Sequence, residues 1–218
     1  MRTYLAPIGF NSTAITRPVL SNGIDTGDKI ILIRPTKTPT DDRAQNAVNE
    51  VTDFLQEVEP EITVTTQTIN HTDFETAILQ CSDLIQAPTD TTAVILGGGA
   101  RDILLPFTIA ALAHAHTINT ALFYSDLSQN VSTWTLPTLT ISTTQQTRKT
   151  LQAITSTNKI SISDLTAQTN KSKSTITRHL SQLEAEGAIT TWKEGKTKFA
   201  QPTTTGKLFI NQHLHKST

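Results

Sequence analysis

The sequence of 218 residues contains one cysteine, Cys81, and this scarcity excludes an internal disulfide bond. Cys81 shares a helically spaced apolar stripe with Phe74, Ala77, Ile78 and Ile85, which indicates a buried core position. Histidines that stand close together are two residues apart on predicted helices, so their side chains point to different faces. The sequence therefore predicts neither a disulfide nor a metal site.

Long hydrophobic runs are also missing. No apolar run approaches the roughly 18 residues that cross a membrane. The first residues, Met1 to Phe10, lack the basic segment and the long apolar segment of a secretory signal. We expect a soluble, cytoplasmic protein without a membrane partner.

Charge is distributed unevenly along the chain, although the total is only −1. Up to residue 142 there are 7 basic and 15 acidic side chains, a balance of −8; after it there are 11 basic and 4 acidic, a balance of +7. This asymmetry predicts an acidic body that carries a basic, polyanion-binding module. A solvated basic tail is the alternative. The Thr-rich segment 139–144 is the expected junction, which gives domains 1–142 and 143–218.

The first domain alternates between predicted strands and predicted helices. Short apolar or alternating runs predict strands at Tyr4–Ile8, Ile30–Ile33, Ile62–Ile69, Ala93–Leu96, Thr120–Tyr124 and Val131–Leu136. Helical periodicity covers Asp41–Glu57, Asp73–Gln86 and Ile103–His116, and a helix-length segment follows the first strand. This alternation predicts an α/β fold: a Rossmann-like, three-layer domain with a mainly parallel sheet.

Two glycine-containing loops follow predicted strands, Gly9 to Thr13 and Gly97 to Asp102. Open α/β sheets bind ligands beyond the carboxyl ends of their strands, and glycine there lets backbone N–H groups approach an anion at a helix N-terminus. Any strand-to-helix turn uses glycine, but three in succession favour a ligand site for phosphate groups. Neither loop matches the nicotinamide fingerprint or the P-loop. The candidate ligand residues are Gly9, Phe10, Asn11, Ser12, Gly97, Gly98, Gly99, Ala100 and Arg101.

The second domain has the pattern of a winged helix-turn-helix. After a helix at Thr147–Ser156, Ser163 is expected to cap a short helix and Ser172 to cap the next, which ends near Gly187. A β-hairpin with a basic tip follows. The second helix would enter the major groove of double-stranded DNA. A polar solvated helix is the alternative. The candidate DNA-binding residues are Ser172, Lys173, Ser174, Thr175, Thr177, Arg178, Lys196 and Lys198.

Together the two halves resemble archaeal CRISPR-associated regulators that fuse a CARF domain (CRISPR-associated Rossmann fold) to a winged helix. The resemblance rests on Gly9-Phe10-Asn11, on the glycine-rich turn with Arg101, and on residues 172–180. It implies a homodimer that binds cyclic tetra-adenylate across its two-fold axis. The resemblance also implies that the winged helices regulate CRISPR-associated genes by binding a promoter or a CRISPR repeat. In the second turn this sequence has Gly98-Gly99 where the relatives tend to have a larger residue before the arginine.

Two other functions stay open. Some CARF domains are ring nucleases, and Ser12, Arg101 or Lys37 would suffice to position a ribose hydroxyl and stabilise charge. The two loops contain no convincing general base, so no catalytic residue is assigned, and no cofactor beyond the effector is expected. A regulator that senses an unrelated metabolite fits the Rossmann-like plan but not the specific loops.

Overall fold

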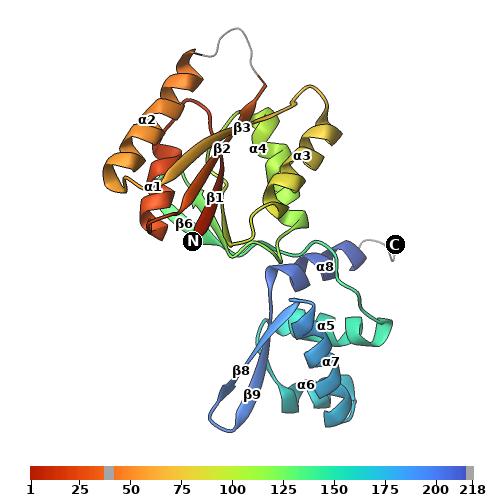
Figure 1. Ribbon diagram of the computed structural model, residues 1–218. Helices are drawn as coiled ribbons and strands as arrows, with labels where there is room; N and C mark the ends of the chain where they lie inside the picture. Colours follow the sequence, from red (N-terminus) through yellow and green to blue (C-terminus); the bar gives the residue numbers. More distant parts are fainter. Residues whose placement is uncertain (37–41, 215–218) are drawn as a thin grey trace. The chain divides into compact units, whose positions relative to one another are not determined.

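The computed structural model describes residues 1–36 and 42–214. The chain forms two compact units, Met1–Leu136 and Pro137–Thr218. Figure 1 shows the first unit as a sheet with helices on both faces and the second as a small helical unit with a β-hairpin. In the described part of the chain, no helix combines the length and apolarity that a membrane crossing needs.

The first unit is built on a six-stranded sheet with the order β3-β2-β1-β4-β5-β6. All neighbouring pairs are parallel except β5 and β6. The strands are β1 (Arg2–Pro7), β2 (Lys29–Pro35), β3 (Thr63–Ile69), β4 (Thr91–Ile95), β5 (Thr120–Tyr124) and β6 (Val131–Trp134). The helices are α1 (Thr13–Asn22), α2 (Asp42–Val58), α3 (Phe74–Gln86) and α4 (Arg101–Ala113). The predicted Rossmann-like, three-layer fold is confirmed.

Two hydrophobic cores hold the three layers together, one on each face of the sheet. Helices α1 and α2 pack on one face through residues such as Ile15 and Val51, and α3 and α4 pack on the other through Phe107 and Cys81. Burial raises the pKa of the Cys81 thiol to about 11, so the thiol stays protonated at neutral pH. Cys81 is thus a core residue, as its place on the apolar stripe predicts.

The second unit contains the expected helix-turn-helix and wing. Its elements are α5 (Gln145–Thr157), β7 (Ile160–Ser161), α6 (Ile162–Thr169), α7 (Lys173–Ala185), β8 (Ile189–Glu194), β9 (Thr197–Pro202) and α8 (Thr204–Leu214). The three strands form one antiparallel sheet with the order β7-β9-β8. Leu165, Ile176 and Leu180 are fully or almost fully buried at the centre of its core. The predicted winged helix-turn-helix is confirmed.

The cap of α6 differs from the prediction. Ser161, not Ser163, precedes the helix, and its hydroxyl accepts a hydrogen bond from the backbone N–H of Asp164 at 3.1 Å. The pairing of Ile160 and Ser161 with β9 ends one residue before the helix begins. The helix therefore starts at Ile162, and Ser163 lies in its first turn with an exposed side chain.

Threonines inside the helices of the second unit satisfy their hydroxyls locally. Thr155 donates to the Leu151 carbonyl at 2.9 Å, and Thr166 donates to the Ile162 carbonyl at 2.6 Å. Thr169 bonds the carbonyl four residues earlier in the same way. These hydroxyls are tied to their own helix.

A buried histidine connects α7 to α5. His179 is 2% exposed, and its Nδ1 lies 2.7 Å from the Thr150 hydroxyl oxygen. Burial lowers the pKa of His179, and the positive charges of Lys171 and Arg178 lower it further. The folded unit therefore favours the neutral imidazole.

We expect the second unit to lose stability in mild acid. Because folding lowers the pKa of His179, its stabilisation is complete above the ordinary histidine pKa of about 6.5 and declines as pH falls from there towards the folded value. Urea unfolding of the full chain in a Trp134→Phe background, where Trp192 is the remaining tryptophan, measures this by fluorescence at pH 7.5 and pH 5.5. His179→Gln should remove the pH-dependent contribution of this histidine. Loss of its buried hydrogen bond should also lower the free energy of unfolding by about 1–3 kcal/mol at pH 7.5. An unchanged pH dependence in this variant would contradict the assignment.

Candidate ligand pocket and DNA-binding surface

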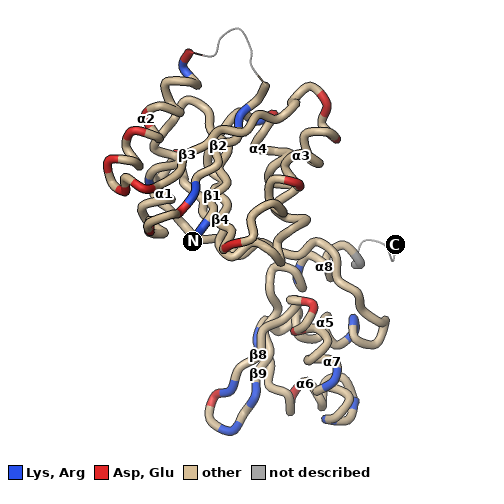
Figure 2. Tube along the Cα trace, in the orientation of Figure 1, with Lys and Arg blue, Asp and Glu red and all other residues tan. Residues whose placement is uncertain are grey.

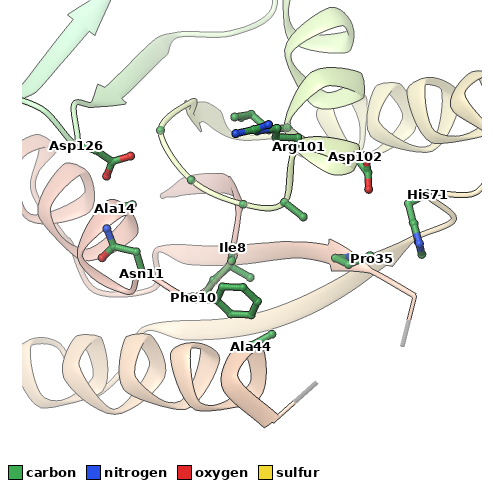
Figure 3. A pocket seen from close by; sticks show the side chains of 16 residues that line it. Ile8, Phe10, Asn11, Ala14, Pro35, Ala44, His71, Arg101, Asp102 and Asp126 are labelled. Carbon is green, nitrogen blue, oxygen red and sulfur yellow. The ribbon is translucent and has the colours of Figure 1, made fainter. Parts of the chain in front are cut away.

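The sheet order reverses between β1 and β4, which lie side by side at its centre. The chain leaves β1 towards α1 on one face and leaves β4 towards α4 on the other. Parallel α/β sheets open a crevice at this point, beyond the carboxyl ends of the strands. Here the crevice is a cavity of about 590 Å³ (Figure 3). It is the candidate ligand site, and we call it the sensor pocket.

All the predicted ligand residues except Ser12 line the sensor pocket. Ser12 instead precedes α1 as its N-cap residue, without a side-chain capping bond. Lys37, named for a possible cleavage reaction, lies outside the described residues. Asp102, the last residue of the second loop, also lines the pocket. The lining residues outside the two glycine loops are Ile8, Ala14, Pro35, Ala44, His71, Leu104 and Asp126.

The glycine run is required by the packing of the chain itself. A Cβ added to Gly97 would lie 2.7 Å from the backbone nitrogen and oxygen of Tyr124, and one added to Gly98 would lie 2.9 Å from the Pro7 carbonyl oxygen. Gly99 has a φ of +95°, and an added Cβ would lie 2.6 Å from the Pro7 Cβ. Close backbone approach and a left-handed conformation therefore explain the three glycines without a ligand.

Charges of both signs surround the sensor pocket. Arg101 is exposed at the first turn of α4, whose N-terminus has no side-chain capping bond. Asp102 and Asp126 bring two carboxylates to the lining. The Arg43 guanidinium lies 4.8 Å from the centre of the Phe10 ring and adds a cation beside the lining. Among the residues described here, no cluster of histidine, cysteine or acidic side chains could hold a metal ion.

His71 enters the sensor pocket from the segment after β3. Its Nδ1 is buried, and no group in the described part of the chain forms a hydrogen bond with it. Figure 3 shows His71 and Asp102 on one side of the opening, and Asn11 and Asp126 on the other. The pocket thus offers hydrogen-bonding groups on both sides of the glycine turn.

A positional signal could have identified several missed residues. Pro35 ends β2, His71 follows β3 and Asp126 follows β5, so each stands at the carboxyl end of a parallel strand. These ends meet at one edge of the sheet. The predicted strands indicate that edge, but the predicted site included only the two loops that contain glycine. Ala44 and Leu104 stand inside helices, where no comparable signal exists.

The exposed face of α7 carries the predicted DNA-binding side chains. Lys173, Ser174, Thr177 and Arg178 are exposed, whereas Ile176 and Leu180 are buried. The Thr177 hydroxyl donates to the Lys173 carbonyl at 2.9 Å, so it is left with acceptor capacity. Lys173 and Arg178 are therefore the cations of this face that can donate to DNA. The Ser174 hydroxyl lies 2.9 Å from that of Ser172 and can donate outwards when it accepts in this contact.

Two of the predicted residues have a structural role at the start of α7. The Ser172 hydroxyl accepts a hydrogen bond from the Thr175 backbone N–H at 3.2 Å. It also lies 2.9 Å from the Thr175 hydroxyl. Ser172 and Thr175 thus form a helix cap, which fixes where the exposed face begins.

Lysines dominate the wing, as Figure 2 shows along β8 and β9. Lys193, Lys196 and Lys198 stand on the hairpin with one acid, Glu194. Lys159 donates to Glu194 Oε1 at 2.7 Å, and the Trp192 indole N–H donates to the same oxygen at 2.9 Å. The hydrogen bond from Lys159 lowers the pKa of Glu194, and the bond from Trp192 adds to this shift. The only acid of the wing is thus neutralised by a partner inside the unit.

Comparisons with protein families divide the chain in the same way. Residues 2–133 match the model of the Csa3 CRISPR-associated Rossmann-like domain, and residues 144–190 match the model of a winged helix-turn-helix DNA-binding domain. A comparison with curated proteins finds no match.

Several solved structures are similar to part of the chain. FabT from Streptococcus pneumoniae, in complex with DNA, is 20% identical over 35% of this chain and 57% of its own, with a TM-score of 0.33. The chain thus spans little more than half of that protein. Reduced HlyU from Vibrio cholerae is 27% identical over 34% of this chain and 76% of its own, with a TM-score of 0.30. The zinc-responsive MarR family member ZitR from Lactococcus lactis is 14% identical over 36% of this chain and 57% of its own, with a TM-score of 0.32.

The family match to the first unit covers more than half of the chain and agrees with the sheet order and the pocket at its reversal point. The match to the second unit agrees with the helix-turn-helix and the wing. The chain therefore belongs to the family of the Csa3 CRISPR-associated Rossmann-like domain, and in this protein that domain is joined to a winged helix-turn-helix DNA-binding domain.

Proposed function

We propose that this protein is a cytoplasmic, homodimeric regulator of CRISPR-associated genes that senses cyclic tetra-adenylate in the sensor pocket and binds promoter or repeat DNA through the winged helix. One observation carries the proposal: a Csa3-type domain has its cavity at the reversal point of the sheet, and the same chain has a helix with an exposed cationic and hydroxyl face. Sensing and DNA binding would then be separate tasks of the two units.

The pocket has the size and chemistry for part of an oligonucleotide. Its volume of about 590 Å³ falls in the usual range for small-molecule sites. Arg101 and the uncapped N-terminus of α4 favour phosphate. A tetranucleotide is larger than one such cavity and is itself symmetric, so a two-fold pair of pockets suits it.

Asp102 and Asp126 restrict how a phosphate-bearing ligand lies in the pocket. A carboxylate repels phosphate but accepts hydrogen bonds from N–H groups. The adenine amino group is such a donor. We therefore orient the phosphates towards Arg101 and the bases towards the carboxylates and the Phe10 ring.

Ring nuclease activity is the second candidate, and His71 favours it. Its buried Nδ1 has no hydrogen-bond partner in the described part of the chain, and as a potential proton acceptor it adds an imidazole to the carboxylate of Asp102 at the pocket. In that reaction the ribose 2′-hydroxyl attacks the adjacent phosphate and the 5′-oxygen leaves, giving a 2′,3′-cyclic phosphate. Chromatography of cyclic tetra-adenylate after incubation with the protein separates sensing alone from sensing with cleavage.

Dimerisation is assigned to α4. Leu105 and Ile109 stand one turn apart on this helix and are 59% and 41% exposed, whereas Phe107 on its opposite face is buried. The helix starts at Arg101 and Asp102 in the pocket. Pairing of this apolar stripe with that of a second copy buries it and brings two sensor pockets to one interface.

Cyclic tetra-adenylate binding should depend on Arg101. Arg101→Ala removes a charged hydrogen-bond donor, so calorimetry should show affinity lower by about tenfold or more. Lys29→Ala removes the same charge at the amino end of β2, away from the lining, and serves as the matched control. Substitution of Gly98 is unsuitable, because a side chain there would meet the Pro7 carbonyl. Equal affinity of Arg101→Ala and the unchanged chain would refute the site.

The oligomeric state should depend on the α4 stripe. Light scattering at tens of micromolar, a range that detects moderate affinity, should find a dimer for the unchanged chain and a monomer for Leu105→Asp with Ile109→Asp. Leu79→Asp places one such charge on an exposed leucine of α3 and should stay dimeric. A dimeric double variant, or a monomeric unchanged chain, would count against α4 as the interface.

DNA binding should be strongly salt-dependent and should require Arg178. If a dimer contacts about six phosphates, log K falls with log salt at a slope of about −5. Arg178→Ala should cost about 1–3 kcal/mol on the region upstream of the protein's own gene if this residue binds a base. Gel shifts at several salt concentrations measure both, with Lys207→Ala on α8 as the control. No binding at low salt, or indifference to Arg178→Ala, would refute the assigned surface.

A further inference from the structure

A second cavity lies in the DNA-binding unit, between the helix-turn-helix and the wing. Its volume is about 420 Å³. Three elements contribute its polar side chains: Ser163 and Thr166 from α6, Lys173 from α7, and Lys196, Thr197 and Lys198 at the start of the second wing strand. We call it the wing cavity.

The wing cavity is purely cationic, in contrast to the sensor pocket. Three lysines line it and no carboxylate does. The nearby acids have partners of their own: Glu194 is bonded to Lys159, and Asp164 accepts from the Ser161 hydroxyl at 2.7 Å. In residues 1–36 and 42–214, none of the three lysines is in an ion pair. Three unneutralised ammonium groups around one hollow favour an anion.

The hydroxyl groups of the wing cavity indicate which class of anion fits there. The Thr166 hydroxyl already donates to the Ile162 carbonyl at 2.6 Å and retains only acceptor capacity. The exposed Ser163 hydroxyl has no hydrogen-bond partner in the described part of the chain and can donate. Lysine ammonium groups and one free hydroxyl suit a tetrahedral oxyanion such as a phosphodiester.

The position of Lys173 relates this cavity to the groove face of α7. At about 100° per residue, Lys173 and Arg178 are separated by about 140° around the helix. Ser174 and Thr177 stand between them on the exposed face. Lys173 therefore marks the edge of this face that adjoins the wing, where the phosphate backbone borders a major groove.

We propose that the wing cavity holds a single DNA backbone phosphate, shared by Lys173, Lys196 and Lys198 and bonded by Ser163. This inference rests on the proposed DNA-binding function and specifies its contacts: the three lysines act together on one phosphate, and not each on its own. Ser163 becomes a phosphate-contacting residue. The shared phosphate fixes the wing relative to the recognition helix on the duplex.

The proposal is tested by the number of phosphate contacts that lysine variants lose. We would titrate the full chain and its Lys→Ala variants against a labelled mixed-sequence duplex of about 30 base pairs, long enough for two half-sites. Each single variant should bind DNA about tenfold more weakly at moderate salt. The triple variant should lose far less affinity than the product of the three single losses, which is about thousandfold. The salt slope of the triple variant should flatten by about one unit per bound protomer.

Controls separate local from general effects. Lys207→Ala removes the same charge from an exposed site on α8 and should leave binding nearly unchanged. Lys→Arg at the three positions keeps the charge and should restore the salt slope. The triple variant should bind cyclic tetra-adenylate like the unchanged chain, which distinguishes a DNA phosphate from a phosphate of the ligand.

Three results would overturn the inference. A slope that flattens by about three units per bound protomer, with losses that multiply, would mean three separate phosphates in each protomer. Unchanged DNA binding by the triple variant would mean that the wing cavity contacts no phosphate. Failure of the unchanged chain to bind DNA at low salt would refute the proposed function itself, and this inference with it.

Discussion

The first unit depends on the close approach of the turn after β4 to its neighbouring strands. Gly97 packs against the backbone of Tyr124 at the end of β5, and Gly98 and Gly99 pack against Pro7 at the end of β1. This contact fixes the carboxyl ends of three strands relative to one another and sets where α4 begins. Arg101 and the uncapped first turn of α4 consequently face the cavity, and the exposed stripe of α4 starts beside it. A side chain at any of the three glycines would separate these parts before it met a ligand.

The fold could be predicted from the sequence because strands and helices alternate with clear periodicity, and each unit has its own apolar pattern. The pocket could be predicted only in part. Its two loops follow from the glycines, although a sequence does not distinguish glycine needed for a ligand from glycine needed for Tyr124 or Pro7. His71 and Asp126 come from segments that carry no motif, and their convergence depends on strand order. Ser161 and Ser163 are both plausible caps, and only the pairing of β7 with β9 selects Ser161.

The two units differ in how they treat charge. The sensor pocket mixes Arg101 with Asp102 and Asp126, which suits a small molecule that bears both phosphates and N–H donors. In the described part of the DNA-binding unit, the three lysines of the wing cavity are not in ion pairs, whereas Lys159 neutralises the wing acid. The phosphates of DNA all carry the same charge and no sequence information, so cationic side chains suffice to contact them. Base contacts distinguish one DNA sequence from another. The net charge of −1 is therefore the sum over two units with different charge distributions.

The threonines of the second unit bear on what keeps α7, the recognition helix of the helix-turn-helix, folded. Thr155, Thr166, Thr169 and Thr177 bond to carbonyls of their own helices, an arrangement that adds no strength between elements. Threonine is also a weak helix former, and helices as short as α6 and α7 are marginal alone in water. Their order must come from Leu165, Ile176 and Leu180 in the shared core. A peptide cut from α7 would be mainly coil, so the surface offered to DNA is a property of the cooperatively folded unit.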